Sequence, residues 1–259
     1  MEAVELTIYN GVATITLNRP NSYNSVNAAL AAAFNMALDK CANNAEVRAV
    51  IITGNGKAFC AGQDLKEVTT PEIMPGFDAL LTERFTPIIT KIIELELPVI
   101  AAVNGVAAGA GANIALACDI IVATEKASFI QAFSAIGLIP DSGGTFTLPR
   151  LVGRAKAMAY TMLGDKIDAI TAEKIGMIYK VFPAEVFEAA VKKMAEGLAN
   201  MPTKSLALTK RAINASYQNT FTEQLALEKK LQIEASETED YAEGVAAFVE
   251  KRKPIFKGK

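Results

Sequence analysis

Residues 98–118, with the sequence PVIAAVNGVAAGAGANIALAC, hold the pattern that decides the fold. The apolar run from Pro98 to Val103 is typical of a strand buried on both faces of a parallel sheet. Three glycines follow it within seven residues and predict a turn, and the small residues from Ala110 to Ala117 predict a closely packed helix. The stretch therefore predicts one strand–turn–helix unit of an α/β protein.

The same stretch is nearly uncharged and about as long as a membrane span, and Gly105 and Gly109 have the spacing of a helix-dimer motif. Pro98, Asn104 and Asn113 interrupt it, however, and the three glycines would weaken a spanning helix. We therefore expect a buried strand and helix here, and no membrane contact.

The chain divides into an α/β part and a helical part. Alternation of strands and helices up to about residue 182 predicts mostly parallel βα units, and helical periodicity continues from there almost to the end. No clear internal repeat is visible. We expect a core over residues 1–195 and a helical region over 196–259. The expected strands are 5–18 (a hairpin around Asn10-Gly11), 49–53, 98–103, 119–123 and 180–182. The expected helices are 27–43, 79–95, 110–117, 145–163, 171–176, 184–199, 203–216, 222–234 and 238–252.

Composition and charge narrow the possible functions. Of 259 residues, 51% are apolar, and 26 Lys and Arg against 28 Asp and Glu leave a net charge of −2. So neutral a balance gives no electrostatic reason to expect a nucleic-acid partner. The three cysteines are widely spaced without a CxxC pair, and the N-terminus lacks signal-peptide features, so we expect reduced thiols and a cytoplasmic protein.

Histidine is absent from the sequence. Its absence excludes Ser-His-Asp and Cys-His catalysis, HExxH zinc sites and proton transfer by imidazole. Proton transfer near neutral pH must then use a carboxylate, a thiol, a lysine or a tyrosine with a shifted pKa. We expect no metal site.

The glycine-rich turn at residues 104–113 is the first candidate site. Free N–H groups at the start of the helix after Gly109 would attract negative charge, as in a site for an oxyanion or a phosphate. No GK[ST] sequence is present, and no acidic residue completes a dinucleotide-binding motif. The residues alone leave two interpretations open with equal weight, an oxyanion site and close packing of helix on strand.

A second loop, KAFCAGQDL at residues 57–65, follows the strand at 49–53. Loops at the carboxyl ends of parallel strands are where α/β proteins bind ligands, and Ala61-Gly62 leaves the backbone accessible. Taken alone, an ordinary βα loop is the better interpretation. Cys60 has no histidine and no CxxC partner to lower its pKa, so we expect a small buried side chain and no nucleophile.

The third candidate is the segment FSAIGLIPDSGGT at residues 133–145. Its single carboxylate, Asp141, follows the apolar side chains of Ile136, Leu138 and Ile139. If these residues wall a pocket, desolvation raises the pKa of Asp141 toward the range of a general base. Alternatively, Asp141 caps the helix that starts near Thr145. The two roles are compatible.

Together these stretches resemble the crotonase (enoyl-CoA hydratase/isomerase) superfamily, in the right order over most of residues 5–180. The matching pieces are LNRP at 17–20 with Asn27, FCAGQDL at 59–65, AVNG through Gly111 at 102–111, CDI at 118–120, and GLIPD with GGT at 137–145. The resemblance implies a spiral of ββα units with a C-terminal helical trimerisation region, a homotrimer or a dimer of trimers. It also implies an acyl-CoA substrate, with coenzyme A as part of the substrate and no separate cofactor.

The resemblance also assigns site residues. It implies that the backbone N–H groups of Gln63 and Ala110 hold the thioester oxygen while Asp141 carries the proton. The implied substrate-binding positions are Ala61, Asp64, Leu65, Gly109, Asn113 and Phe133. It places the phosphates of coenzyme A near residues 61–65, where Lys57 and Lys66 are candidates beside the simpler interpretation of solvated lysines. Lys253 and Lys257 could reach a neighbouring subunit's ligand, and we expect Glu83 and Arg84 to form a surface ion pair.

Two positions decide the reaction within the superfamily. Its hydratases use two glutamates, and this chain has Asn113 and Phe133 at those positions. Asp141 stands where the hydratases usually have glycine, as in the isomerases and in a dehalogenase. The dehalogenase pattern places Trp-His where this chain has Phe133-Ser134, which argues against dehalogenation.

Among the isomerases, the three site segments most resemble the ring-1,2-epoxyphenylacetyl-CoA isomerases. The resemblance thus implies conversion of that epoxide to an oxepin-CoA, or a shift of a double bond from 3-enoyl-CoA to 2-enoyl-CoA. Two different functions stay open, an enoyl-CoA hydratase of fatty-acid oxidation and a non-catalytic CoA-binding member in which Asp141 only caps a helix.

Overall fold

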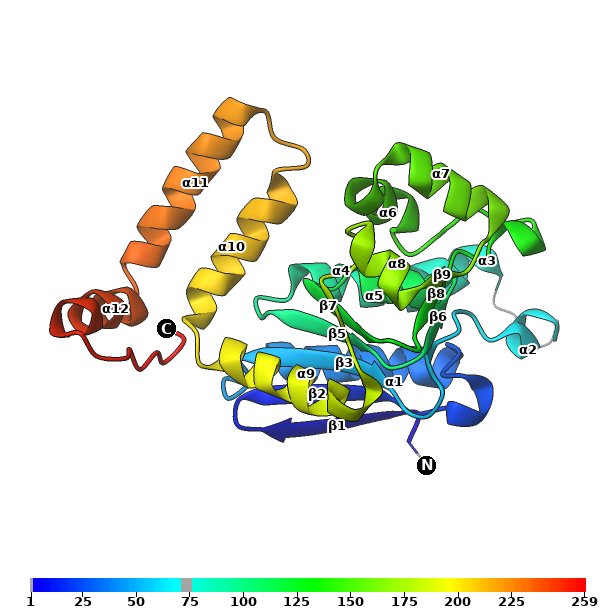
Figure 1. Cartoon of the computed structure of the whole chain (residues 1–259), viewed down its shortest axis with the longest axis horizontal. Coiled ribbons are helices and arrows are strands. Elements are labelled where there is room, and N and C mark those ends of the chain that lie inside the picture. Colours follow the sequence, from blue (N-terminus) through cyan, green and yellow to red (C-terminus); the bar gives the residue numbers. More distant parts are fainter. Residues whose placement is uncertain (1, 71–75) are drawn as a thin grey trace.

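The computed structural model describes residues 2–70 and 76–259, and its core consists of two sheets (Figure 1). The large sheet has the order β1-β2-β3-β5-β7-β10, in which β1 is antiparallel to β2 and the other neighbours are parallel. Its strands are β1 (Val4–Tyr9), β2 (Val12–Leu17), β3 (Ala49–Gly54), β5 (Val99–Val103), β7 (Ile120–Thr124) and β10 (Lys180–Phe182). The small sheet has the order β4-β6-β8-β9, with strands β4 (Ala58–Cys60), β6 (Val106–Ala108), β8 (Ser128–Ile130) and β9 (Ile167–Asp168).

The two sheets are linked by a repeated connection. Each of β3, β5 and β7 in the large sheet is followed directly by β4, β6 or β8 in the small sheet, and a helical segment comes next. This confirms the expected α/β spiral of ββα units. The repeat escapes detection in the sequence because β4, β6 and β8 have only 3 residues each, too few for a period of two to be visible.

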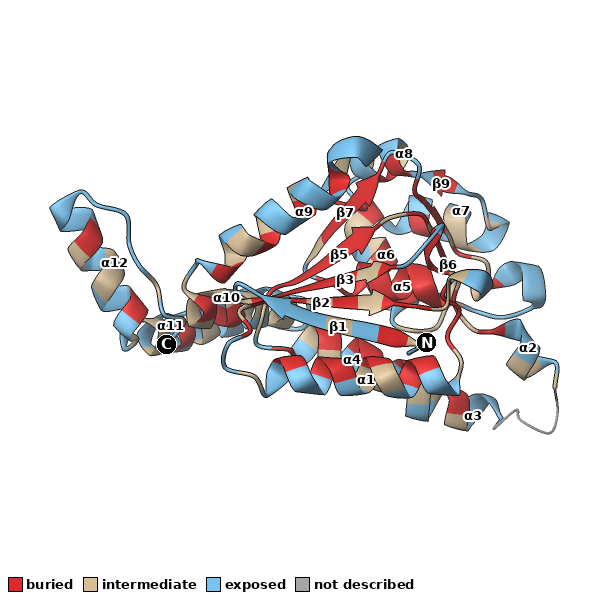
Figure 2. Cartoon of the chain, turned by 90° about the horizontal axis from the view of Figure 1, so that it is seen from below, coloured by how far each residue is buried: buried red, intermediate tan, exposed pale blue. Residues whose placement is uncertain are grey.

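Alternating residues of the large sheet face two separate layers of helix. In β3, Val50 and Ile52 belong to the main core, whereas Ala49 and Ile51 pack in a smaller cluster with α9 (Ala184–Ala199). The main core also includes side chains of α1 (Ala28–Ala42) and α4 (Thr86–Glu94). Figure 2 shows the buried strands between α9 and the pair α1 and α4, so the central strands β3, β5 and β7 are covered on both faces.

Most expected helices are present, but two are divided. The expected helix at 79–95 consists of α3 (Phe77–Leu80), a π-helical turn η2 (Leu81–Phe85) and α4. The one expected at 145–163 forms α6 (Gly144–Val152) and α7 (Arg154–Leu163), separated at Gly153. The remaining helical segments of the core are η1 (Pro20–Ser22), α2 (Leu65–Val68), α5 (Ala110–Leu116), η3 (Ser134–Ile136) and α8 (Ala169–Lys174).

Three helices extend from the core as an arm: α10 (Thr203–Ala215), α11 (Phe221–Ser236) and α12 (Glu239–Glu250) (Figure 1). The Arg48 guanidinium fastens it by donating hydrogen bonds to Thr203 Oγ1 (2.9 Å) and to the carbonyls of Met201 (2.6 Å) and Phe256 (2.8 Å). The expected boundary at 195/196 falls inside α9, whose residues Ala195 and Ala199 are still buried against the sheet. The arm itself begins at Thr203.

Residues 98–118 form β5, β6 and α5, and within the described part of the chain no helix is long and apolar enough to cross a membrane. All three cysteines are free and buried. Burial raises the pKa of the Cys60 thiol to about 12, against the weaker opposing effect of the Gly62 backbone. That thiol therefore stays protonated at neutral pH, which agrees with its interpretation as a small buried side chain.

Candidate active site

Backbone hydrogen bonds on either side of Gln63 hold the loop after β4. Val26 N–H donates to the Gly62 carbonyl (2.7 Å), and Asp64 N–H donates to the Val26 carbonyl (3.0 Å). These two bonds form a short parallel bridge between Val26 and Gln63. Within the described chain, the Gln63 N–H itself has no acceptor.

The Asp64 side chain fixes this loop through hydrogen bonds within the protein. Its carboxylate accepts hydrogen bonds from Arg19 Nη2 (2.8 Å) and from the Lys66 amide (3.1 Å), which caps α2. Burial alone would raise the pKa of Asp64, but the hydrogen bonds and the charge of Arg19 outweigh it and hold the pKa below the ordinary value. The side chain expected to contact substrate is thus bound to the protein, and Arg19 of the LNRP segment acts as its partner.

The second free amide belongs to Ala110, the first residue of α5. A first-turn N–H has no partner within its own helix, and Ala110 donates to no other group in the described residues. Its predecessor Gly109 is fixed from β8, because Gly109 N–H donates to the Ile130 carbonyl (2.8 Å). The start of α5 therefore presents an unpaired donor and the positive end of a short helix.

The two loops touch at Gly62. This residue has φ +85°, and a methyl group there would lie 2.9 Å from the Ala108 carbonyl oxygen and 3.3 Å from the Ala110 nitrogen. Only glycine allows both the backbone angle and this approach. The free amides of Gln63 and Ala110 consequently lie on adjoining segments, an arrangement that suits a developing oxyanion.

Phe133 provides an apolar wall beside these amides. Its side chain is buried, and its ring lies 3.8 Å from the position of a Cβ atom on Gly109. Ala61 is half-buried and Leu65 is exposed on the same loop as Gln63. The structure therefore brings Gln63, Gly109, Ala110 and Phe133 together.

Asp141 lies in the turn before α6 and is half-buried. Its Oδ1 atom is fully buried, with no hydrogen-bond partner among the described residues. Burial raises the pKa of its carboxyl above the ordinary 3.8, and the neighbouring Ser142 hydroxyl lowers it to a smaller extent. A carboxylate desolvated in this way is a better proton acceptor than one in water.

Two expectations about the surroundings of Asp141 are wrong. The N-cap of α6 is Gly143, without a side-chain cap, so the Asp141 carboxylate does not cap the helix. Ile136, Leu138 and Ile139 are exposed, so they do not wall the carboxylate. An apolar run in sequence does not reveal which way its side chains point when the backbone follows a turn.

Asn113 links α5, which carries the Ala110 amide, to the turn that carries Asp141. It is fully buried, and its Nδ2 donates to the main-chain carbonyl of Asp141 (2.8 Å). Because Asn113 lies three residues after Ala110 on α5, it places Asp141 on the same side of that helix as the free amide. The side-chain amide expected to meet substrate is thus used within the protein.

Among the charged residues considered for the site, the lysines are exposed and Arg84 forms an ion pair. Lys57 and Lys66 are exposed, as are Lys253 and Lys257 at the far end of the chain. Arg84 pairs with Glu67 of α2 and not with the neighbouring Glu83 as expected. The sequence offers no signal for this pairing across 17 residues.

Comparison with known proteins agrees with this geometry. A family model described as enoyl-CoA hydratase/isomerase matches residues 7–259. The chain is 44% identical over 261 residues to the 1,2-epoxyphenylacetyl-CoA isomerase of Escherichia coli K12, covering 100% of both chains. It is 43% identical over 256 residues to a Rhodobacter capsulatus protein named "Probable enoyl-CoA hydratase", covering 99% of this chain and 98% of the other. The crystal structure of an enoyl-CoA hydratase from Bacillus anthracis superimposes with a TM-score of 0.91 at 34% identity, covering 99% and 100% of the two chains.

Gly144→Ala tests the tight packing between the Asp141 turn and α5. The added methyl would lie 2.3 Å from Asn113 Nδ2, so we expect the free energy of unfolding to fall by about 1–3 kcal/mol. Gly197→Ala on α9 is the matched control, because its methyl meets no described atom within 4 Å, and alanine favours a helix by up to about 1 kcal/mol. Urea unfolding measures both variants. An equal effect of the two substitutions would contradict the packing described.

Proposed function

Since the chain belongs to the enoyl-CoA hydratase/isomerase family, we propose that this enzyme is an acyl-CoA isomerase in which Asp141 carries a proton between two carbons of the acyl group. The observation that carries the proposal is the combination of two backbone amides with one half-buried carboxylate, where both amides and one carboxylate oxygen lack a partner in the described part of the chain. The two glutamate positions of the hydratases hold Asn113 and Phe133, so Asp141 is the acid–base group left in the site.

In the proposed mechanism, the N–H groups of Gln63 and Ala110 donate to the thioester carbonyl oxygen as it becomes negatively charged. One preorganised donor of this kind typically contributes about 2.7–4 kcal/mol to stabilisation of the transition state. The resulting enolate makes the α and γ carbons of an acyl-CoA accessible to proton transfer. Both donors are backbone groups, so their positions depend on the fold and not on the side chains of these residues.

Asp141 then removes a proton from one carbon and returns it to another. Its raised pKa suits this role, because a base is most effective when its pKa approaches the working pH. The buried ring of Phe133 excludes water from that side of the enolate. A double-bond shift moves only a proton and a double bond, and expansion of a ring epoxide to an oxepin also breaks the carbon–carbon bond that the epoxide shares with the ring. Both are isomerisations within the substrate, so the coenzyme A of the substrate is the one non-protein group that the proposal needs.

We propose two related substrates. A shift of the double bond from 3-enoyl-CoA to 2-enoyl-CoA uses the proton transfer directly. The likeness to the Escherichia coli isomerase over the full length supports conversion of 1,2-epoxyphenylacetyl-CoA to an oxepin-CoA as well. In both cases Ala61, Leu65 and Gly109 would line the thioester, and Lys57 and Lys66 are the candidates for the phosphates of coenzyme A.

A hydratase function has the names of several relatives in its favour. A hydratase of this superfamily needs two carboxylates to position and deprotonate water. Here Asn113 cannot accept a proton, and its amide is engaged with the Asp141 carbonyl (2.8 Å). Phe133 places a hydrocarbon ring at the second position.

A non-catalytic role and dehalogenation have less support. A non-catalytic member in which Asp141 only caps a helix conflicts with the cap of α6, which is formed by Gly143 without a side-chain bond. Dehalogenation would use Asp141 as a nucleophile and a histidine to activate water, and the sequence contains no histidine.

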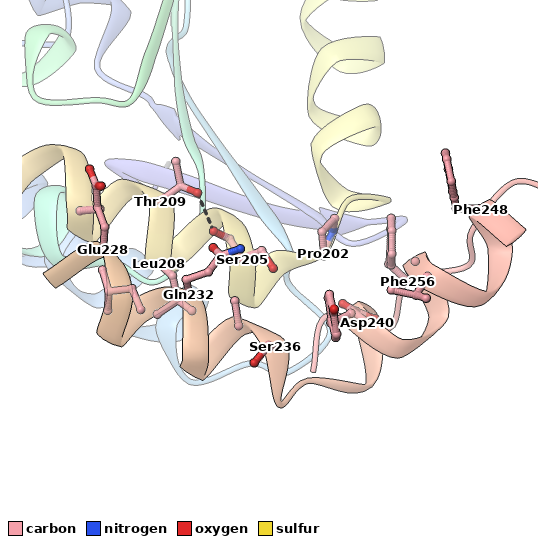
Figure 3. Close-up of a pocket in the computed structure, with 16 residues that line it drawn as sticks. Pro202, Ser205, Leu208, Thr209, Glu228, Gln232, Ser236, Asp240, Phe248 and Phe256 are labelled. Atoms are coloured by element: carbon pink, nitrogen blue, oxygen red, sulfur yellow. Dashed lines mark hydrogen bonds between the residues drawn. The ribbon is translucent and has the colours of Figure 1, made fainter. Parts of the chain in front are cut away.

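We also propose that the helical arm assembles with other copies of the chain into a homotrimer or a dimer of trimers. A hollow of about 600 Å³ lies between α10, α11 and α12, and Figure 3 shows Phe248 extending from α12 at one end of it. The arm leaves Phe221 78%, Phe248 85% and Val249 73% exposed. Neighbouring exposed apolar side chains such as Phe248 and Val249 are typical of a surface that a partner covers.

Asp141→Asn tests the assignment of the proton carrier. We expect kcat for isomerisation of a 3-enoyl-CoA to fall by at least about 100-fold, the lower end of what general acid–base catalysis contributes. The dissociation constant for acyl-CoA should change by less than about threefold, since the thioester contacts come from backbone amides. Turnover near the wild-type rate would refute the role of Asp141.

The pH dependence of the wild-type enzyme follows from the same group. The carboxylate is the active form, and its pKa lies above 3.8, so kcat should rise with pH through that raised pKa and then level off. The acidic limb should disappear from the residual activity of Asp141→Asn. An unchanged limb in this variant would assign the titration to another group.

Phe248→Glu tests assembly through the arm. A charge on this exposed aromatic position should weaken a contact between copies and lower the molar mass measured by light scattering. Tyr179→Glu, at a position 67% exposed on the core, is the control and should keep the wild-type mass. A monomeric wild-type protein would contradict the proposed assembly.

A further inference from the structure

Two buried side-chain amides form a chain of hydrogen bonds that ends at Asp141. Gln131 Nε2 donates to Asn113 Oδ1 (2.9 Å), and Asn113 Nδ2 donates to the Asp141 carbonyl (2.8 Å). Gln131 is 1% exposed and Asn113 is 0% exposed. Both polar atoms of the Asn113 amide, which burial removes from water, are thereby satisfied, whereas Gln131 Oε1 has no hydrogen-bond partner among the described residues.

The amide of Asn113 has one orientation that serves Asp141. Its Nδ2 must face the Asp141 carbonyl, because a flipped amide would bring two oxygens together. Gln131 supports this orientation, because its Nε2 donates to Oδ1 on the other side of the amide. Gly144 packs directly against the same Asn113 amide, since a Cβ atom on Gly144 would lie 2.3–2.7 Å from the atoms of this amide.

The segment around Gln131, residues 130–133, also holds the start of α5, where Ala110 supplies one of the two oxyanion donors. The carbonyl of Ile130, next to Gln131, accepts from Gly109 N–H (2.8 Å), the residue before Ala110. Phe133, two residues later, lies against Gly109. Residues 130–133 therefore hold the first turn of α5 through the backbone and the Asp141 turn through the side chain of Gln131.

We propose that Gln131 is a positioning residue for the proton carrier, acting through Asn113 to fix the main chain of Asp141 relative to the amide of Ala110. The inference rests on the proposed function of Asp141. Gln131 does not touch the reacting atoms, and no feature of its sequence neighbourhood marks it. Its loss should leave the oxyanion donors in place and allow the carboxylate to move away from the carbon that it must reach.

Gln131→Met and Gln131→Glu are the test variants, since both keep the length of the side chain. Methionine removes the donor, and a glutamate carboxylate would oppose Asn113 Oδ1. We expect kcat to fall roughly ten- to a hundredfold, as for a small misplacement of a reacting group, while KM changes by less than about twofold. Ser128→Ala on β8 is the matched control, because Ser128 is 1% exposed and its hydroxyl has no described partner. This control should retain the wild-type kcat.

A double-mutant cycle with Asn113→Leu separates positioning from general packing. If Gln131 acts through Asn113, Gln131→Met should reduce kcat little further in the Asn113→Leu background. Fully additive losses, or a KM change as large as the change in kcat, would overturn the proposal. Wild-type kcat in both Gln131 variants would also overturn it.

Titration of Asp141 provides a measurement that does not depend on turnover. In protein labelled with ¹³C at aspartate carboxyl groups, the Asp141 resonance is identified by its loss in Asp141→Asn. Its midpoint should shift in Gln131→Met and stay unchanged in Ser128→Ala. A shift in an enzyme that isomerises no substrate would refute the proposed function and support the positioning role, whereas an unchanged midpoint would refute that role.

Discussion

The approach of Gly62 to the first turn of α5 is the contact on which the site depends. Parallel pairing of β4 with β6 brings the carboxyl ends of these strands to one edge of the small sheet. The loop after β4 and the start of α5 then meet, with room for no side chain at Gly62. Two backbone donors are thereby left free side by side, and in a dry environment such donors stabilise charge far better than water does.

The rest of the site is held against this contact by polar groups within the protein. Asp64 and Arg19 secure the Gln63 loop, and Asn113 secures the Asp141 turn. The two carboxylates differ in their surroundings and therefore in their chemistry. Asp64 has a cationic partner and a lowered pKa, which suits a structural anchor. Asp141 has a buried oxygen without a partner among the described residues and a raised pKa, which suits a group that exchanges protons.

Holding Asp141 in this state costs stability. Because the pKa of Asp141 is raised in the folded protein, the folded state binds the proton more tightly than the unfolded chain does. The contribution of Asp141 to the free energy of unfolding therefore becomes less favourable as pH rises from 3.8 through the raised pKa. Below the ordinary pKa both states are protonated and the difference disappears. A cost of this kind is expected where function opposes stability.

Sequence patterns identify the parts of the fold that consist of long periodic segments. β3, β5 and β7 are short apolar runs between helices, and the arm has helical periodicity throughout, so both are predictable. The small sheet is not, because its strands have 2 or 3 residues. In the site, Gln63, Ala110 and Asp141 stand out through the family resemblance. Gln131 does not, and the LNRP match marks Arg19 without indicating its partner. The partners of these two residues lie 18 and 45 residues away, and only the fold brings them together.

The product formed from a 3-enoyl-CoA in D₂O, analysed by mass spectrometry, tests most directly whether one carboxylate beside two amides makes this enzyme an isomerase. We predict accumulation of the 2-enoyl-CoA, with deuterium entering only at the carbons that exchange protons with Asp141 and no accumulation of the water adduct. Formation of 3-hydroxyacyl-CoA as the main product would contradict the isomerase assignment and identify a hydratase.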